Sequence, residues 1–170
     1  MGMGIEGKQI TLDIAGLGIV FHSPDFAQHI SEGDDYLTSS YSTEQQVQSH
    51  IQKGTIVCFG TGTPGTFILT FHTGYPEESF LQSCEFKLRL GLHCSGGHVC
   101  FRDLYDLMNW HRDCPNRHTV ELEDGFYHVT LCSNPPESGV LGDNQRVLVY
   151  LQKLREMPPL AKQGIPSLCM

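Results

Sequence analysis

Apolar and polar residues alternate along most of the chain, and this period-two pattern is typical of β-strands with one buried face. The alternation is clearest from Cys84 to Leu92, where Glu85, Lys87 and Arg89 occupy the polar positions and predict a solvent-facing side. Turn-forming glycines and prolines separate such runs. Further strands are predicted at Thr55–Gly60, Thr66–Thr73, His98–Phe101, Thr119–Leu122, Phe126–Ser133 and Gln145–Lys153.

Two alternating runs near the start of the chain, Ile10–Ile14 and Leu17–Phe21, are separated only by Ala15 and Gly16. A two-residue connection that contains glycine favours a tight turn, so these runs predict an N-terminal β-hairpin.

Helical patterns are few and short. Ser42 is placed to cap a helix over Thr43–Gln52, with Gln45 closing a capping box and Gly54 ending the helix. A second short helix is predicted to start at Ser23-Pro24, because proline suits the first helical position. The sequence therefore predicts an all-β fold, an antiparallel β-sandwich of jelly-roll-like type with eight or nine strands and one or two short helices.

The chain length of 170 residues suits one domain, and no repeat or linker divides it. We expect residues 1–170 to form a single β-sandwich domain. The proline-containing segment 157–170 is expected to lie over its surface as a C-terminal strap.

The seven cysteines and the N-terminal residues indicate the cellular compartment in which the protein is expected. No charged and apolar signal segment precedes the first alternating run, so we expect a cytoplasmic protein. The cytosol keeps thiols reduced, and most of the cysteines are expected to be small buried apolar residues. No apolar run is long enough for a membrane span.

The formal charge of −8 is unevenly distributed. Residues 1–85 hold ten Asp or Glu and only two Lys, whereas residues 86–170 hold nine acids and nine bases. No Lys or Arg occurs between Lys8 and Lys53. An acidic chain without a basic run is a poor ligand for nucleic acid or an anionic membrane, and such asymmetry can attract a basic protein partner. The alternative is an acidic surface that serves solubility alone.

The connection from His22 to Tyr41 is long for a compact β domain, and long loops often carry function. It combines carboxylates with aromatic residues, a mixture that suits a contact surface for a basic protein. We predict that the partner-binding residues are Asp25, Glu32, Asp34, Asp35 and Tyr36.

A second group of residues has the chemistry of metal ligands. Histidine and cysteine gather between residues 93 and 118, and zinc requires four such ligands in a tetrahedral arrangement. The spacing matches no standard zinc motif. If Val99 and Phe101 face the core, two ligands share the opposite side of that strand. The candidate metal ligands are Cys94, His98, Cys100, His111, Cys114 and His118.

The same group of residues is also compatible with a thiol-dependent enzyme, because a thiolate beside an imidazole is the minimal activated nucleophile. Buried cysteines and scattered surface histidines are the simpler interpretation of the group.

The segment Val120–Cys132, which reads VELEDGFYHVTLC, resembles a segment of the bacterial competence-protein-J family, in which an acidic turn leads into a tyrosine-containing strand. The preceding strands, at Phe86–Leu90 and His98–Phe101, follow a similar order. The resemblance covers the C-terminal half and implies a cytosolic antiparallel β-sandwich that inhibits a DNA-entry nuclease. It transfers no individual binding residue.

Two hypotheses follow. The first is a non-enzymatic cytosolic binding protein of inhibitor or immunity type, which engages a basic protein partner, such as a nuclease or toxin, through an acidic N-terminal face, without nucleic acid, membrane or cofactor. The alternative is a zinc- or thiol-dependent enzyme that acts on a small molecule through the Cys/His group. The sequence leaves the oligomeric state open.

Overall fold

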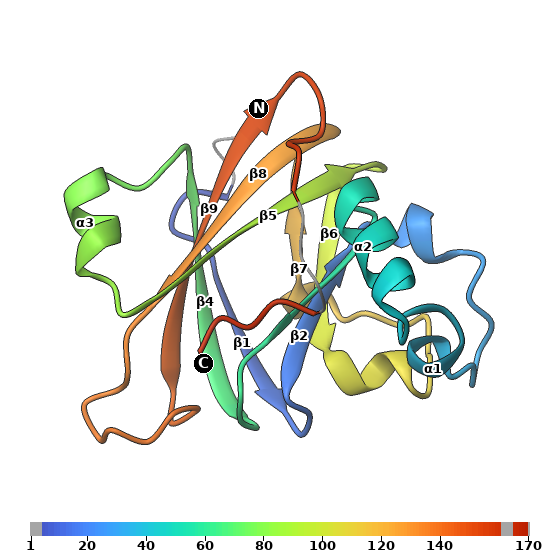
Figure 1. The fold of residues 1–170 in the computed structure, drawn as a ribbon, viewed down its shortest axis with the longest axis horizontal. Helices are drawn as coiled ribbons and strands as arrows, with labels where there is room; N and C mark the ends of the chain where they lie inside the picture. The colour runs from blue at the N-terminus through green and yellow to red at the C-terminus, as the bar shows by residue number, and fades with distance from the viewer. Residues whose placement is uncertain (1–4, 161–164, 170) are drawn as a thin grey trace.

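The computed structural model describes residues 5–160 and 165–169, and it is built mainly from nine β-strands in two sheets (Figure 1). The first sheet has the order β1 (Gln9–Ile14), β4 (Gly65–Thr73), β9 (Gln145–Leu154), β8 (Gly125–Ser133), β5 (Phe86–Cys94). The second has the order β3 (Ile56–Gly60), β2 (Gly18–His22), β6 (His98–Asp103), β7 (Thr119–Glu121).

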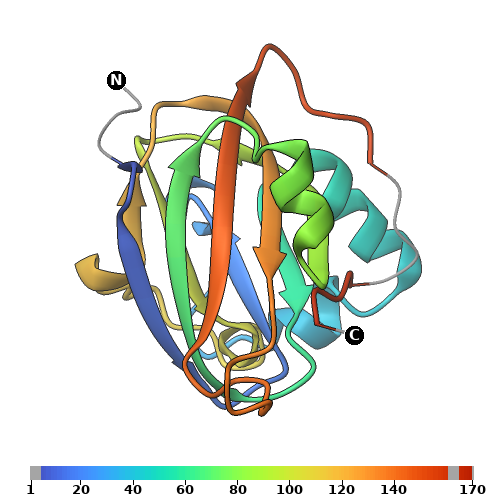
Figure 2. The same cartoon turned by 90° about the vertical axis from the view of Figure 1, so that its left-hand side faces the viewer.

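The two sheets share one apolar core. Both contribute side chains to a cluster of fully buried residues, and Phe71 of β4 meets Phe101 of β6 with ring centroids 5.1 Å apart. Phe101 also stacks on Phe21 of β2 at 5.2 Å. Figure 2 shows the first sheet crossing in front of the second. Burial of this apolar surface is the main favourable contribution to folding.

The predicted strands are confirmed to within two residues at each end, but their pairing is not antiparallel throughout. β4 and β9 run parallel, with Phe67 opposite Gln145. The chain enters β4 from β3, which belongs to the other sheet. No hairpin therefore fixes the direction of β4 relative to β9.

The predicted N-terminal hairpin is wrong. β1 pairs with β4, whereas β2 pairs with β3 and β6, so the chain changes sheets between them. The carboxylate of Asp103 accepts the backbone N–H groups of Ala15 at 2.8 Å and Gly16 at 3.2 Å. A Cβ atom at Gly16 would lie 2.5 Å from Asp103 Oδ1, so this crossing requires glycine. Asp103 is 87 residues away from Gly16, and no local pattern reveals it.

The predicted helix over Thr43–Gln52 is confirmed one residue further along, as α2 (Glu44–Lys53). Thr43 rather than Ser42 caps it, Gln46 rather than Gln45 completes the capping box, and Gly54 ends it at φ 66°. Ser23-Pro24 introduces a single 3₁₀ turn, η2 (Pro24–Ala27). The structure also contains α1 (Tyr36–Ser40), α3 (Glu78–Ser83), η3 (Leu104–Leu107) and η4 (Asn116–His118).

The second sheet is covered on its outer face as well. Helix α2 packs against β3 of this sheet and against β5, and α1 lies next to α2, away from α3 (Figure 1). A second buried cluster forms there, from Val20, Ala27, Ile30, Tyr36, Tyr41, Val47, Ile51, Ile56, Cys58, Leu107 and Trp110. Every residue of β2 is consequently buried. We call this cluster and the segments that form it the outer layer.

Five cysteines are buried thiols, as predicted, namely Cys58, Cys84, Cys94, Cys132 and Cys169. The expectation of reduced cysteines is wrong for the other two. Cys100 of β6 and Cys114 form a disulfide with their Cα atoms 6.5 Å apart. The disulfide closes a loop that contains η3 and Trp110, and so attaches this part of the outer layer to the sheet.

We expect that replacing both bridged cysteines, Cys100→Ala with Cys114→Ala, lowers the free energy of unfolding by about 3 kcal/mol, because a loop of about 15 residues is no longer closed in the unfolded chain. Urea unfolding of both proteins measures the difference. A reductant should weaken the wild type to the level of the variant and leave the variant unchanged. Equal stability of the two oxidised proteins would contradict a structural role for the bridge.

His22 lies in the outer layer with only 1% of its surface exposed. Burial lowers the pKa of its imidazole to about 4, with the nearby Arg102 charge acting in the same direction and the Ser23 carbonyl opposing it. The unfolded chain therefore binds this proton between about pH 6.5 and about pH 4, while the folded protein does not.

We predict that the free energy of unfolding falls as the pH is lowered through this window, with His22 contributing at most about 1.4 kcal/mol per pH unit. His22→Gln should flatten the profile between pH 7 and pH 4, measured by urea unfolding. The exposed His29→Gln serves as the control and should keep the wild-type slope. If His22→Gln retains that slope as well, the buried neutral imidazole is not its source.

Candidate functional site

The connection from Ser23 to Thr43 is anchored in the outer layer rather than projecting as a free loop. Its apolar residues Ala27, Ile30 and Tyr41 are buried. Two backbone hydrogen bonds join it to the neighbouring loop: Gly33 N–H donates to the Trp110 carbonyl at 2.7 Å, and Trp110 N–H donates to the Asp34 carbonyl at 2.9 Å. The polar residues between the anchors are therefore held in fixed positions at the surface.

The four predicted carboxylates of this connection are exposed, and hydrogen bonds hold each of them. Asp34 accepts Ser31 N–H at 3.0 Å, and Asp35 caps α1 by accepting Thr38 N–H at 3.0 Å. Glu32 accepts Arg112 N–H at 2.7 Å, and Asp25 accepts the Ser95 hydroxyl at 3.2 Å. We call Asp25, Glu32, Asp34 and Asp35 the acidic segment. Carboxylate oxygens accept several hydrogen bonds each, so the acidic segment remains able to meet cations.

Tyr36 differs from the other predicted contact residues because it is buried. Its hydroxyl donates to His50 Nε2 at 2.6 Å, while His50 Nδ1 donates to the Gln46 carbonyl at 2.7 Å. Burial raises the pKa of Tyr36 and lowers the pKa of His50, so both groups are neutral near pH 7. In this structure Tyr36 joins the connection to α2, and only 9% of its surface is exposed.

Arg102 of β6 occupies the centre of this region and is only 5% exposed. Its guanidinium donates to the carbonyls of His111 at 2.6 Å and Arg112 at 3.3 Å, and it lies over the Trp110 ring, 4.2 Å from its centroid. Asp106 lies 3.7 Å away. Burial lowers the pKa of Arg102, and Asp106, Glu32 and Asp113 counteract that effect. A buried arginine retains its charge when such partners replace water.

A small acidic cleft that the sequence did not predict adjoins Arg102. It has a volume of about 270 Å³ and brings Asp13 of β1 together with Asp103, Asp106 and Asp113. Burial raises the pKa of Asp106, an effect that His111 and Arg102 oppose. Asp13 comes from the acidic half of the sequence and the other three from the neutral half. Only the folded chain places them together.

The candidate metal ligands are dispersed. Val99 and Phe101 face the core as expected, and Cys100 lies on the opposite side of β6, but it is bonded to Cys114. Cys94 belongs to the core between the sheets, and His98 hydrogen-bonds the Gly96 carbonyl at 3.0 Å. His111 and His118 line the acidic cleft.

Among the described residues, no three His, Cys, Asp or Glu side chains are grouped so that they could hold a metal ion. The zinc site stays a prediction that elemental analysis of the purified protein tests.

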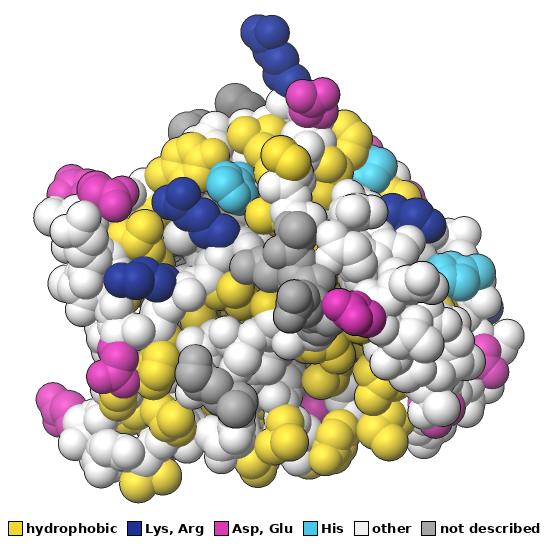
Figure 3. Space-filling model, viewed as in Figure 1, with side chains coloured by type: hydrophobic (Ala, Val, Ile, Leu, Met, Phe, Trp, Pro, Cys, Tyr) yellow, Lys and Arg dark blue, Asp and Glu magenta, His cyan; other side chains and the backbone are white. Residues whose placement is uncertain are grey.

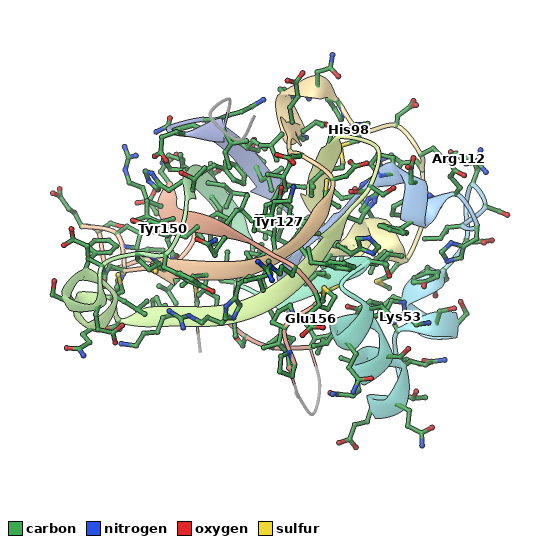
Figure 4. The ribbon with its side chains drawn as sticks, turned by 90° about the horizontal axis from the view of Figure 1, so that it is seen from above. Lys53, His98, Arg112, Tyr127, Tyr150 and Glu156 are labelled. Atoms are coloured by element: carbon green, nitrogen blue, oxygen red, sulfur yellow. A yellow bond between two sulfur atoms is a disulfide. The ribbon has the colours of Figure 1, made fainter. Side chains whose placement is uncertain are left out.

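The charged side chains near the acidic segment do not form one continuous patch. Figure 3 shows separate acidic groups around the part of the molecule that carries α1 and α2. Figure 4 places Arg112 beside the connection after β2, and Lys53 at the end of α2. Separated carboxylates with few cations among them suit contact with individual Lys and Arg side chains of a partner.

The arrangement defines the class of this protein: a mainly β protein whose second sheet carries a fixed outer layer with an acidic segment. No helix in the described part of the chain is long and apolar enough to cross a membrane. No protein-family model matches the chain, and no curated protein sequence matches it.

Two solved structures resemble it. One is the crystal structure of ComJ, inhibitor of the DNA degrading activity of NucA, from Bacillus subtilis. It has a TM-score of 0.53 and 14% sequence identity, and the match covers 86% of this chain and 96% of that one. The other is described as crocagin biosynthetic gene J. It has a TM-score of 0.56 and 12% identity, and the match covers 88% of this chain and 98% of that one. The resemblance to the competence-protein-J fold is confirmed, and it extends well beyond the C-terminal half.

We predict that Arg102→Met lowers the free energy of unfolding by about 2–4 kcal/mol, because two buried carbonyls lose charge-assisted hydrogen bonds and Asp106 loses its closest cation. Urea unfolding at pH 7 measures the loss. Arg117→Met removes an exposed arginine from the same part of the chain and should change stability by less than about 0.5 kcal/mol. Equal effects of the two substitutions would contradict the anchoring role of Arg102.

Proposed function

We propose that this protein is a non-enzymatic binding protein of inhibitor type and that its partner is a basic protein of enzyme type, with a nuclease as the first candidate. The observation that carries the proposal is the fold shared with the nuclease inhibitor ComJ over 86% of the chain. At 14% sequence identity the shared fold does not identify the partner of this protein. The second support for the proposal is therefore the charge distribution.

The acidic segment supplies that argument. Its four carboxylates are exposed, and hydrogen bonds hold them in place. Fixed carboxylates lose less conformational freedom on binding than mobile ones. A nuclease that binds DNA presents lysines and arginines spaced to meet phosphates, and an array of carboxylates can occupy the same positions. The same acidity disfavours direct binding to nucleic acid or an anionic membrane by this protein.

We also propose the jelly-roll-like sandwich as the finer description of the fold, supported by the apolar core that the two sheets share. For the location we propose the cytosol, which suits the five buried thiols. On this proposal Cys100 and Cys114 are reduced in the cell, and the bridge of this structure forms only under oxidising conditions. Thiol labelling in intact cells, followed by denaturation, tests the location, and bridged cysteines in most molecules would contradict it.

We predict that neutralising the acidic segment, by Asp25→Asn, Glu32→Gln, Asp34→Asn and Asp35→Asn together, weakens partner binding by at least tenfold. Asn and Gln retain the carbonyl oxygens that accept the local hydrogen bonds, so the fold should be preserved. Immobilised wild type should retain a basic protein from an extract of the source cells at about 50 mM salt and release it at about 500 mM.

A matched control removes four exposed carboxylates elsewhere, Glu77→Gln, Glu78→Gln, Glu85→Gln and Glu137→Gln. This control changes the net charge equally and should bind like the wild type. Inhibition of the retained protein's nuclease activity then tests the inhibitor role. If the two variants bind the partner equally well, or if its retention does not depend on the salt concentration, the acidic segment is not the binding surface.

A further inference from the structure

A cavity of about 260 Å³ lies between η2, the outer face of β2 and β6, and the loop that carries Trp110 and Arg112. Its polar lining comes from His22, Gln28, Arg102, Trp110 and Arg112. Two of these residues are cations and none is an acid, although the protein as a whole has a charge of −8. The composition of the cavity therefore favours an anion.

His22 contributes a hydrogen-bond acceptor to this lining. Its Nδ1 lies 3.1 Å from the Ser23 carbonyl, which can only accept, so Nδ1 carries the proton and donates. Because burial keeps the imidazole neutral at pH 7, Nε2 is left as an acceptor. Nε2 is buried and has no hydrogen-bond partner among the described residues.

Arg102 and Trp110 contribute two donors. The terminal nitrogens of Arg102 are engaged by backbone carbonyls, but its Nε–H is buried and unpaired, as is the indole Nε1–H of Trp110. An unpaired buried polar group costs about 1–3 kcal/mol. Three such groups on residues that line one cavity are a concentrated cost, which a ligand that pairs with them would remove.

We propose that this cavity binds a small oxyanion that also carries an O–H group, the chemistry shared by hydrogen phosphate and a short hydroxycarboxylate. The oxyanion accepts hydrogen bonds from Arg102 Nε–H and Trp110 Nε1–H, its O–H donates to His22 Nε2, and the exposed Arg112 adds charge at the mouth. The volume of about 260 Å³ admits an ion of this size. This inference does not depend on the proposed function.

The acidic residues near Arg102 do not compete with the ligand for its Nε–H group. Asp106 lies 3.7 Å from Nη1 and lines the acidic cleft rather than this cavity. Glu32 accepts the backbone N–H of Arg112, and within the described part of the chain no ion pair joins these two side chains. That guanidinium has one hydrogen bond, at 3.5 Å, to the Gln28 carbonyl.

Trp110 is the single tryptophan of the chain, so its fluorescence reports directly on this cavity. We expect a saturable change in Trp110 fluorescence when inorganic phosphate or glycolate is added at pH 7 and constant ionic strength, with a Kd below about 10 mM. Sulfate and acetate match these ions in size and charge type but lack the O–H group, and they should bind at least fivefold more weakly. No saturable change with any of the four ions, or equal affinity for hydroxylated and non-hydroxylated ions, would overturn the proposal.

Three variants, one of them a control, test whether the ion binds in this cavity. Arg112→Ala alters an exposed side chain, should fold normally, and should weaken binding of the hydroxylated ions about tenfold. Arg117→Ala removes the same charge from an exposed position outside the cavity and should bind like the wild type. His22→Phe should abolish the preference for phosphate over sulfate. Wild-type affinity in Arg112→Ala would place the ion elsewhere and contradict the assignment, whether or not His22→Phe folds.

Discussion

The buried guanidinium of Arg102 is the interaction on which the outer layer depends. A charge taken out of water needs replacement partners, and Arg102 finds them in two backbone carbonyls, the Trp110 ring and Asp106. These partners all belong to residues 106–112, so satisfying one charge holds that loop against β6. Trp110 in turn exchanges backbone hydrogen bonds with Gly33 and Asp34. Arg102 therefore contributes, through Trp110, to the fixed position of Asp34 in the acidic segment, while the hydrogen bond from Ser95 holds Asp25.

Period-two alternation predicted every strand because it depends on one buried face, which each strand has. It could not predict that β2 and β3 are buried on both faces, since that depends on α1 and α2 covering the second sheet. It also could not predict pairing. Ala15-Gly16 is as suitable for a change of sheet as for a hairpin, and the deciding partner, the Asp103 carboxylate, is supplied by a strand 87 residues further along.

The candidate site was predictable where a residue's role is local. The exposed carboxylates of the acidic segment follow from composition, and Asp35 caps α1 with its own neighbours. Tyr36 stays a predicted contact residue, but its burial depends on the hydrogen bond to His50 of α2, which no local pattern around Tyr36 reveals. The role of Arg102 is not local either: one arginine near the end of a short strand resembles an ordinary surface residue, and only the loop folded over it makes it buried.

The acidic half and the neutral half of the sequence do not form separate regions of the folded protein. Asp103, Asp106 and Asp113 come from the neutral half, yet they meet Asp13 around one cleft, while Arg102 and Arg112 of that same half line a cavity without acids. Acidic cleft and cationic cavity share Arg102, which lies between them. Counted along the sequence, the acids and bases of residues 86–170 cancel to a net charge of zero, which hides both environments. Because the acidic cleft and the cavity share Arg102, an anion bound in the cavity would also change the charge balance of the cleft.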